Sequence, residues 1–435
     1  MSSKTKTTGA MDDSTPALAP KLRFPEFRGA DAWKPTTIGA LGRFYYGKSA
    51  PKWSLTEDAP TPCVRYGELY TKFGPIISQT YSRTNIDPET LRFSKGGEIL
   101  IPRVGEKPEE FGKCCAYLPL KGIAIGEMIS VLETKQHPLF YTYYFRNLHK
   151  EFAKVVEGQN VKNLYFTELQ PLPIHRPTLP EQKKVAECLS SVDELIAAHV
   201  RKFDALKTHK KGLMQQLFPR EGETQPRLRF PEFQKAADWA EASLGDLCDR
   251  IMDGTHFSPK TKDGPRPYLT SKNVKNGRID LSNLSYISEE EHLAIYKRCP
   301  VKRHDVLLTK DGANTGNCAL NNLDFEFSLL SSVAVLRGKP RVLLQGFLFQ
   351  SILSDSIQSL ISESMSGQAI TRITLAKISA FSIPVTSLPE QQRIADCLTA
   401  LDDLIAAQTQ KLKALKTHKQ GLMQQLFPVS ADVEA

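Results

Sequence analysis

The sequence lacks the ligand patterns that would indicate a metal centre or a disulfide scaffold. None of its eight cysteines forms a C-x-x-C pair, and no histidines cluster near them at metal-ligand spacing. Structural zinc needs several converging soft ligands, so the pattern does not predict a zinc site. We interpret the scattered thiols as small, buried apolar residues of a cytosolic protein.

Long apolar runs are also missing. No segment approaches the ~20 consecutive apolar residues of a membrane-spanning helix. The first twenty residues are rich in small and polar side chains and lack the basic-then-apolar order of a signal peptide. We therefore expect a disordered leader and a cytoplasmic protein with no membrane contact.

Catalytic signatures are scarce as well. Gly42–Ser49 has the spacing of a phosphate-binding P-loop, but its bulky Arg, Phe and Tyr side chains leave no room for a tight phosphate nest. Glu133 and Lys135 could form half of a nuclease site, although Arg337 takes the place of the acid in the second half of the chain. No N-P-P-[YF] motif or glycine-rich loop for S-adenosylmethionine occurs. We expect no catalytic residue, no metal site and no cofactor on this chain.

What the chain does contain is a long internal repeat, which should be sought before any other pattern. The segments Leu179–Pro219 and Leu388–Pro428 agree at 27 of 41 positions without a gap. The hexapeptide LRFPEF occurs at Leu22–Phe27 and again at Leu228–Phe233, each time followed by a tryptophan. The chain is therefore two copies of one unit, a globular part followed by a long helix. The globular parts differ widely, which suggests one task performed on two targets, although neutral drift after duplication is an alternative.

Both repeated segments carry a coiled-coil pattern. Apolar side chains recur at alternating spacings of four and three residues, a seven-residue repeat typical of a coiled-coil seam. Polar groups interrupt the seam at His199, Lys210, Gln408 and Lys419, which would help to fix the register. The predicted seam residues are Val185, Leu189, Val192, Ile196, Phe203, Leu206, Leu213, Leu217, Ile394, Leu398, Leu401, Ile405, Leu412, Leu415, Leu422 and Leu426.

Charge predicts how the two helices pair. In residues 181–200 four acids outnumber two bases, whereas residues 201–218 contain five bases and one acid. The second helix repeats this distribution, so antiparallel pairing would set each acidic half against a basic half. Roughly 38 residues at ~1.5 Å each make a rod of about 57 Å. We expect two globular heads joined by this antiparallel rod, with pseudo-twofold symmetry.

At this point the chain resembles the DNA specificity subunits of type I restriction–modification systems. The markers are LPEQ at Leu179 and Leu388, a short isoleucine–proline strand before each, SGQAITRI at Ser366–Ile373, and the LRFPEF…W opening. The first half has EGQNVKNL at Glu157–Leu164 in place of GQAITRI. The resemblance covers about residues 22–428.

The resemblance implies an α+β fold with two mixed α/β target recognition domains, each reading one half of a split DNA sequence. The coiled coil would set the spacer and dock two methyltransferase subunits, and motor-nuclease subunits would join them. S-adenosylmethionine, ATP and Mg would then reside on those partners. We expect a leader at 1–21, recognition domains at 22–178 and 228–387, conserved helices at 179–219 and 388–428, a linker at 220–227 and a tail at 429–435.

Contacts to DNA should come from loops in the heads, where the copies differ. Bases are read by Arg, Lys, Asn, Gln, Ser and Thr, and phosphates by Lys and Arg. The first head offers Lys48, Ser49, Lys52, Arg65, Tyr66, Arg103 and Lys107. The second offers Thr255, His256, Lys260, Lys262, Arg266, Lys272, Asn273, Lys310, Asn314 and Thr315. Any one of these could instead be an ordinary solvated loop residue.

Two other functions remain open on the sequence. The moderate net charge of +9 permits a polyanionic partner without proving one. A self-contained nuclease would use Glu133 or an unrecognised site, and a coiled-coil scaffold for proteins would not contact DNA at all.

Overall fold

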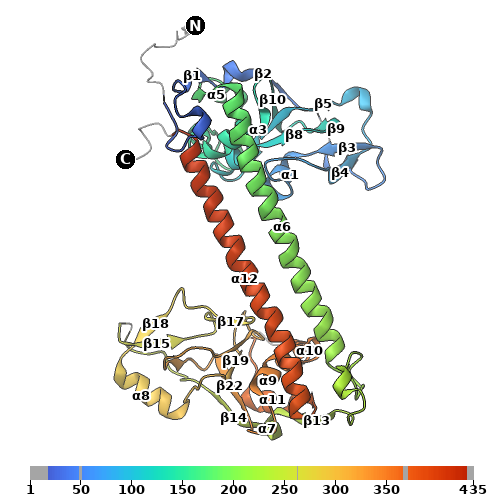
Figure 1. Cartoon of the computed structure of the whole chain (residues 1–435), viewed down its shortest axis with the longest axis vertical. Coiled ribbons are helices and arrows are strands. Elements are labelled where there is room, and N and C mark those ends of the chain that lie inside the picture. The colour runs from blue at the N-terminus through green and yellow to red at the C-terminus, as the bar shows by residue number, and fades with distance from the viewer. Residues whose placement is uncertain (1–17, 49–50, 262, 366–370, 429–435) are drawn as a thin grey trace. The chain divides into compact units, whose positions relative to one another are not determined.

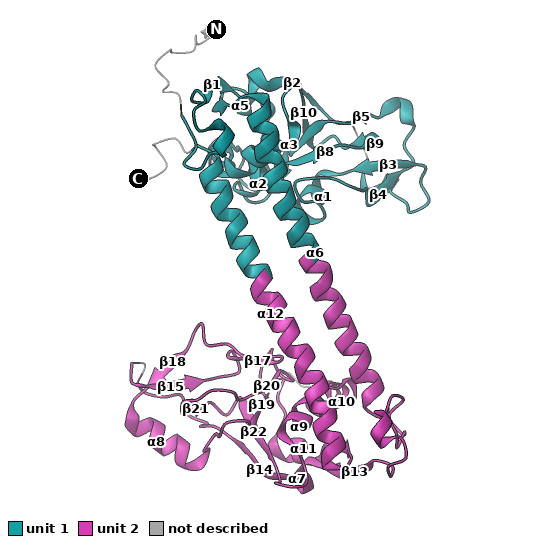
Figure 2. Cartoon of the chain, viewed as in Figure 1, with its two compact units in different colours: residues 1–198, 412–435 teal, residues 199–411 magenta. Residues whose placement is uncertain are grey.

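The computed structural model describes residues 18–48, 51–261, 263–365 and 371–428. The chain forms two compact units, residues 1–198 with 412–435 and residues 199–411 (Figure 2). Two 39-residue helices, α6 (Leu179–Leu217) and α12 (Leu388–Leu426), each begin in one unit and end in the other (Figure 1). The prediction of two long helices in an α+β fold is therefore confirmed. Within the described ranges, no helix has an apolar stretch of the length that a bilayer crossing requires.

Unit 1 is built on two four-stranded sheets. The first is antiparallel, with the order β2 (Gly42–Tyr46), β10 (Ile129–Thr134), β6 (Glu98–Pro102) and β8 (Ala116–Leu118). The second has the order β4 (Ser82–Thr84), β3 (Thr61–Val64), β9 (Lys121–Ile125) and β5 (Phe93–Lys95), and β3 runs parallel to β9. Two short antiparallel pairs join β1 (Lys34–Thr37) to β12 (Pro173–Arg176) and β7 (Val104–Gly105) to β11 (Lys162–Asn163).

The helices of unit 1 pack around an aromatic core. They are α1 (Tyr66–Thr71), α2 (Glu110–Lys113), α3 (Pro138–Asn147), α4 (His149–Lys154) and α5 (Phe166–Leu169). Helix α3 begins with a proline at its first turn and is buried over seven consecutive residues, as expected of a helix that is apolar on all sides. Its Tyr144 ring stacks on Phe427, at the end of α12, with the ring centroids 5.0 Å apart. The end of the second long helix is thus part of this core.

Unit 2 has an equivalent four-stranded antiparallel sheet and a second sheet of three strands instead of four. Its antiparallel sheet has the order β14 (Cys248–Asp253), β22 (Val333–Gly338), β19 (Val306–Thr309) and β20 (Cys318–Leu320). A second sheet has the order β18 (Ser285–Ile287), β15 (Arg266–Leu269) and β21 (Ser328–Leu329), with β15 parallel to β21. The remaining pairs are β13 (Ala240–Ser243) with β23 (Ser382–Val385) and β16 (Val274–Lys275) with β17 (Arg278–Ile279).

The helices of unit 2 also pack around a core. They are α7 (Leu244–Leu247), α8 (Glu289–Arg298), α9 (Gln345–Ile352), α10 (Asp355–Met365) and α11 (Leu375–Ala380). Phe218, just after α6, packs on Trp239 and Phe347 in the core of this unit. Since the four-stranded sheets agree in strand order and direction, and each second sheet has one parallel pair, the duplication extends into the globular parts whose sequences differ.

The long helices pair antiparallel. In unit 2, Lys210 of α6 bonds Asp402 of α12, and Gln408 of α12 bonds His199 of α6. From the first pair to the second, the residue number falls in α6 and rises in α12. The two helices therefore run in opposite directions. Every predicted seam residue is buried or half-buried.

Each unit contains one copy of a polar contact across this seam. In unit 1 the Nζ of Lys419 lies 2.6 Å from Asp193, and the hydroxyl of Tyr143 on α3 donates to the same carboxylate at 2.7 Å. Burial lowers the pKa of Lys419, and the Asp193 carboxylate opposes that shift. In unit 2 Lys210 pairs with Asp402 in the same manner. The basic half of each helix thus meets the acidic half of the other, as the charge distribution predicted.

The start of each long helix is tied to the LRFPEF segment by a buried ion pair, named here the Arg–Glu clamp. Arg23 donates to both carboxylate oxygens of Glu181 at 2.7 and 2.8 Å, and Arg229 donates to both oxygens of Glu390 at 2.8 Å. The glutamates are 1% exposed and the arginines 11% and 6%. The remaining guanidinium hydrogens are donated to backbone carbonyls in the turn that follows LRFPEF. The two most repeated motifs of the sequence are therefore the two halves of one structural contact.

The glutamine of LPEQ makes a second repeated contact. Gln182 accepts a hydrogen bond from the backbone N–H of His137, and Gln391 accepts one from that of Leu344. His137 and Leu344 are the residues immediately before α3 and α9. Each long helix is thereby fixed to the first core helix of its own unit, in addition to the LRFPEF segment.

Removing one partner of the Arg–Glu clamp should destabilise its unit strongly. We expect Arg229→Met to lower the free energy of unfolding by about 3 kcal/mol, because Glu390 is left as a buried carboxylate without its cation. Arg303→Met is the control, because Arg303 and Asp324 form an ion pair that is 59% and 79% exposed. Urea unfolding followed by circular dichroism measures both. Equal midpoints for the two variants would contradict the structural role of the clamp.

Candidate nucleic-acid interface

In unit 1 the predicted DNA-contacting residues gather around the turn formed by residues 125–129. The Lys48 backbone N–H donates to the carbonyl of Ile125, and the Arg103 N–H donates to that of Met128. The Gly126 N–H donates to the carbonyl of Val64, beside Arg65. Three cations that lie far apart in the sequence are therefore brought to one end of the two sheets.

These basic residues differ in their exposure to solvent and in the contacts that their side chains make. Lys48 and Lys52 are exposed, and Lys107 is exposed with an ion-pair distance of 3.6 Å to Glu110. Arg103 is half-buried, with its guanidinium 4.9 Å from the Tyr46 ring centroid and 5.9 Å from that of Tyr165. Arg65 and Tyr66 are half-buried at the start of α1, and Ser49 lies outside the described residues.

In unit 2 the candidate residues gather around residues 329–332, which follow the equivalent strand β21. The Thr255 N–H donates to the carbonyl of Leu329, and the Lys310 N–H donates to that of Ser332. The Asn314 amide lies 3.5 Å from the carbonyl of Ser271, next to Lys272. The same end of the same sheets therefore carries the polar loops in both units.

Three of the second-unit candidates have their polar groups engaged by other groups of the protein, two of them buried and one, Arg266, near the surface. Lys310 is 1% exposed and lies 3.3 Å from both Asp253 and Asp311. Asn273 is 5% exposed, accepts from the Thr270 N–H and donates to two backbone carbonyls. Arg266 donates to both oxygens of Glu289 at 2.6 and 2.8 Å. Their contacts stabilise the conformation of the loops in which they lie.

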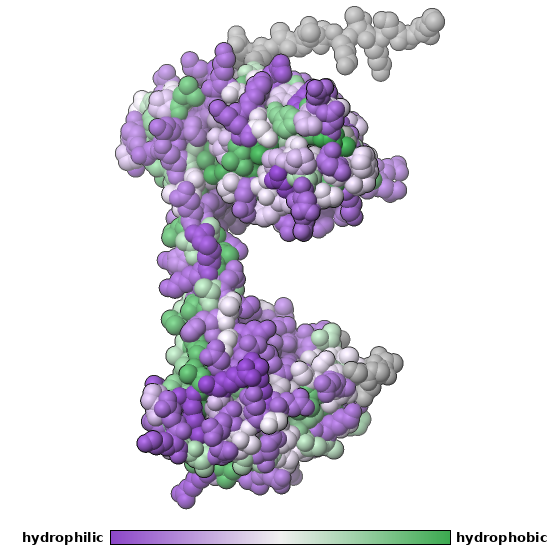
Figure 3. Space-filling view, turned by 90° about the vertical axis from the view of Figure 1, so that its right-hand side faces the viewer, coloured by the Kyte–Doolittle hydropathy of each residue, from purple (hydrophilic) through white to green (hydrophobic). Residues whose placement is uncertain are grey.

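The other second-unit candidates lie nearer to solvent. His256, Lys260 and Lys272 are exposed, and Thr255, Asn314 and Thr315 are half-buried. Lys262 lies outside the described residues, as do residues 366–370 of the SGQAITRI stretch. On the face drawn in Figure 3, hydrophilic side chains predominate over both units and apolar ones occur in small groups.

Sequence reasoning missed Arg372 as a candidate cation. It is 53% exposed and lies 3.4 Å from Asp311, whose backbone bridges it in an antiparallel pairing. The equivalent pairing in unit 1 joins Val104 to Asn163. Arg372 belongs to the SGQAITRI stretch, so its position in a marker motif was the available signal.

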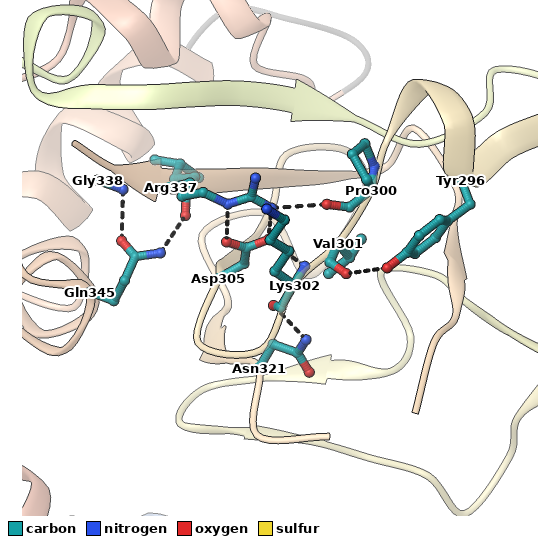
Figure 4. Close-up of polar contacts among 10 residues, drawn as sticks. Tyr296, Pro300, Val301, Lys302, Asp305, Asn321, Arg337, Gly338 and Gln345 are labelled. Carbon is teal, nitrogen blue, oxygen red and sulfur yellow. Dashed lines mark hydrogen bonds and ion pairs between the residues drawn. The ribbon is translucent and has the colours of Figure 1, made fainter. Parts of the chain in front are cut away.

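Glu133, considered for a nuclease site, and its counterpart Arg337 both hold ion pairs. Glu133 pairs with Lys95 at 2.8 Å, and this contact lowers the pKa of the Glu133 carboxyl. At the equivalent position of β22, Arg337 donates to both oxygens of Asp305 at 2.7 and 2.6 Å and to the carbonyl of Pro300 (Figure 4). In the described ranges, no three His, Cys, Asp or Glu residues are placed to hold a metal ion.

Comparison with known proteins gives a consistent result for both halves. The model of a family described as type I restriction modification DNA specificity domain matches residues 32–208 and again residues 236–417. The chain is also similar to the specificity subunit of the type I restriction enzyme MjaVIII from Methanocaldococcus jannaschii. The two are 24% identical over 427 residues, which is 93% of each chain.

Two solved structures share the fold. The S subunit of a type I restriction-modification system from M. genitalium superposes with a TM-score of 0.62 and 16% identity, over 95% of this chain and 100% of that one. A chain from a structure on complex assembly and conformational transition of the type I R-M system superposes with a TM-score of 0.53 and 17% identity. That superposition covers 91% and 97% of the two chains.

The Glu133 ion pair allows a direct test of the nuclease alternative. We expect Glu133→Gln to leave DNA cleavage and methylation by the assembled complex unchanged, since Glu133 is 36% exposed and paired with a lysine. Lys95→Gln, which removes the other partner, is the matched control. Loss of cleavage in Glu133→Gln alone, measured on a plasmid substrate, would support a nuclease centre on this chain.

Proposed function

This chain belongs to the family of type I restriction-modification DNA specificity subunits, and we propose that its two target recognition domains each read one half of a split duplex sequence. The specificity subunit is a non-catalytic component of its complex. The observation that carries the proposal is the contrast between repeated and diverged parts. The long helices and the four-stranded antiparallel sheet recur in both halves, whereas the loops at the ends of β2, β6, β14 and β19 have different residues.

Within each domain we assign different roles to the candidate residues. Exposed lysines at positions 48, 52, 260 and 272 would contact phosphates, because a flexible ammonium group suits a backbone charge that carries no sequence information. Half-buried residues with fixed side chains, such as Arg103, Thr255 and Asn314, would contact base edges. Lys310 and Asn273 would hold the loops that present them.

We further propose that the paired helices set the number of unread base pairs and bind the modification subunits. Repeated ion pairs hold the two helices together along their seam. The number of residues in each helix sets its length. Exposed apolar residues on the helices, Leu195, Val200 and Leu404, offer contact points for a partner. Leu195 and Leu404 occupy equivalent positions of the repeat, which suits two copies of one methyltransferase subunit. The catalytic cofactors S-adenosylmethionine, ATP and Mg would belong to the methyltransferase and motor-nuclease partners.

Lengthening both helices should change only the spacer. We expect an insertion of four residues after Lys207 together with four after Lys416 to widen the unread gap by about 2 bp, since four residues add ~6 Å of helix. The half-sites should be unchanged because the loops are untouched. The methylation motif of cells that carry the variant with its modification partner measures this. An altered half-site at constant spacing would refute the assignment.

Phosphate contacts should be visible in the salt dependence of binding. We expect Lys272→Ala to weaken binding to all duplexes alike and to reduce the slope of log K against log salt by about 1. Lys235→Ala is a suitable control, because Lys235 is an exposed lysine in the turn after the second LRFPEF segment. Fluorescence anisotropy over a salt series gives both slopes. A loss confined to one base position would indicate base reading instead.

A further inference from the structure

Equivalent loops leave the sheets of the two units at the same point. Gly47 follows β2 and Gly254 follows β14, and a Cβ on either would collide with the backbone carbonyl of Ile125 or Leu329, respectively. Lys48 and Thr255, the next residues, donate their N–H groups to those same carbonyls. The close approach therefore fixes where each loop starts, and the loops run to β3 and β15.

Each of these loops displays one aromatic side chain to solvent. Trp53 is 76% exposed and Phe257 is 78% exposed, the highest values among the large hydrophobic side chains of the described ranges. The next highest is Leu293 at 59%. Neither ring contributes to a hydrophobic core, so folding of the chain alone does not explain them.

The backbone beneath each ring is held by hydroxyl hydrogen bonds. Next to Trp53, the fully buried Ser54 donates to the carbonyl of Pro51 and shares a hydrogen bond with Thr84 at 2.8 Å. The Thr255 hydroxyl accepts from the Phe257 N–H at 3.2 Å. The rings are thus presented on ordered supports, which lowers the entropic cost of using them for binding.

Basic residues lie near both rings in the sequence. Lys48 and Lys52 precede Trp53, and His256 and Lys260 lie on either side of Phe257. An exposed aromatic face beside exposed basic side chains matches the two surfaces of a nucleic acid, apolar base faces and phosphates. Apolar side chains of DNA-binding proteins can enter a base step and partly unstack it.

We propose that Trp53 and Phe257 insert their rings between bases of the duplex, one ring in each half-site. This inference rests on the proposed function and adds the means by which each domain distorts its half-site. Because deformable base steps admit such a ring at lower cost, insertion would contribute to sequence preference without a hydrogen bond to a base.

The divergence of the loops favours DNA over a protein partner at these rings. A modification subunit that binds twice would need the same surface twice, as the helices provide with 27 identities in 41 positions. The loops instead carry tryptophan in one unit and phenylalanine in the other, with different neighbours and different distances from the shared glycine. Two half-sites of different base sequence would need loops with different side chains to read them.

The chain contains its own optical probe for the test. Of its three tryptophans, Trp33 and Trp239 are 1% and 4% exposed, so acrylamide should quench Trp53 almost alone. The full chain is titrated with its split target, selected from a random duplex pool, that carries 2-aminopurine at successive positions of each half-site. Insertion predicts that the duplex protects Trp53 from acrylamide and that 2-aminopurine fluorescence changes at one step in each half-site.

Paired variants assign each ring to its half-site. Trp53→Ala should weaken target binding about 5- to 150-fold, the effect of losing one stacked base, and abolish the 2-aminopurine signal in one half-site only. Phe257→Ala should do the same in the other half-site. Leu293→Ala removes an exposed apolar side chain from α8 and should change neither signal. All three residues are exposed, so equal unfolding midpoints will show that folding is intact.

The outcomes separate this inference from the proposed function. Selective binding of the split target with Trp53 still quenched as in the free protein would overturn insertion and leave the function standing. Protection of Trp53 with no 2-aminopurine change would also overturn insertion, because it indicates contact within a groove. If the wild-type chain prefers no split sequence, both the insertion of the rings and the proposed function are contradicted.

Discussion

The Arg–Glu clamp is the contact on which the rest of the structure depends. A carboxylate that is 1% exposed is costly to bury, and a bidentate guanidinium with its remaining hydrogens bonded to carbonyls compensates for that cost only in a narrow geometry. The geometry fixes where LRFPEF lies against the start of each long helix. The adjacent glutamine of LPEQ then fixes the first core helix. In each unit, these two repeated contacts tie the head to the start of its long helix.

Antiparallel pairing also brings the end of the other long helix into the core of each unit. Phe427 at the end of α12 lies in the core of unit 1, and Phe218 after α6 lies in the core of unit 2. Each core therefore contains the beginning of one long helix and the end of the other. The Lys–Asp pairs that close the seam are also bonded by a side chain of α3 or α9. The residues repeated between the two halves make structural contacts, whereas the residues of the loops differ between the halves.

Much of this frame could be predicted from sequence because its determinants are local and periodic. The seven-residue spacing predicted the seam, and the segregation of charge along each helix predicted antiparallel pairing. The helices begin at the predicted residues Leu179 and Leu388 and end two residues before the predicted limits. Each helix has a proline at its second position and one acid in its first turn, both of which favour a helix start.

The candidate interface was less predictable, since burial depends on residues distant in sequence. Lys310 reads as an exposed loop cation, yet the fold brings it to Asp253, which lies on a different strand. Asn273 was proposed to contact DNA, and its amide is taken up by carbonyls of the following loop. The sequence analysis did not single out Trp53. Only the arrangement of the strands shows that it faces solvent in the loop equivalent to that of Phe257.

The account as a whole claims that two unlike domains on one repeated frame read two separate half-sites. The most direct test is the methylome of cells that express this chain with its modification partner. The account predicts a single methylated motif with two different specified parts, separated by a constant number of unspecified base pairs. A continuous motif, or two identical half-sites, would contradict it.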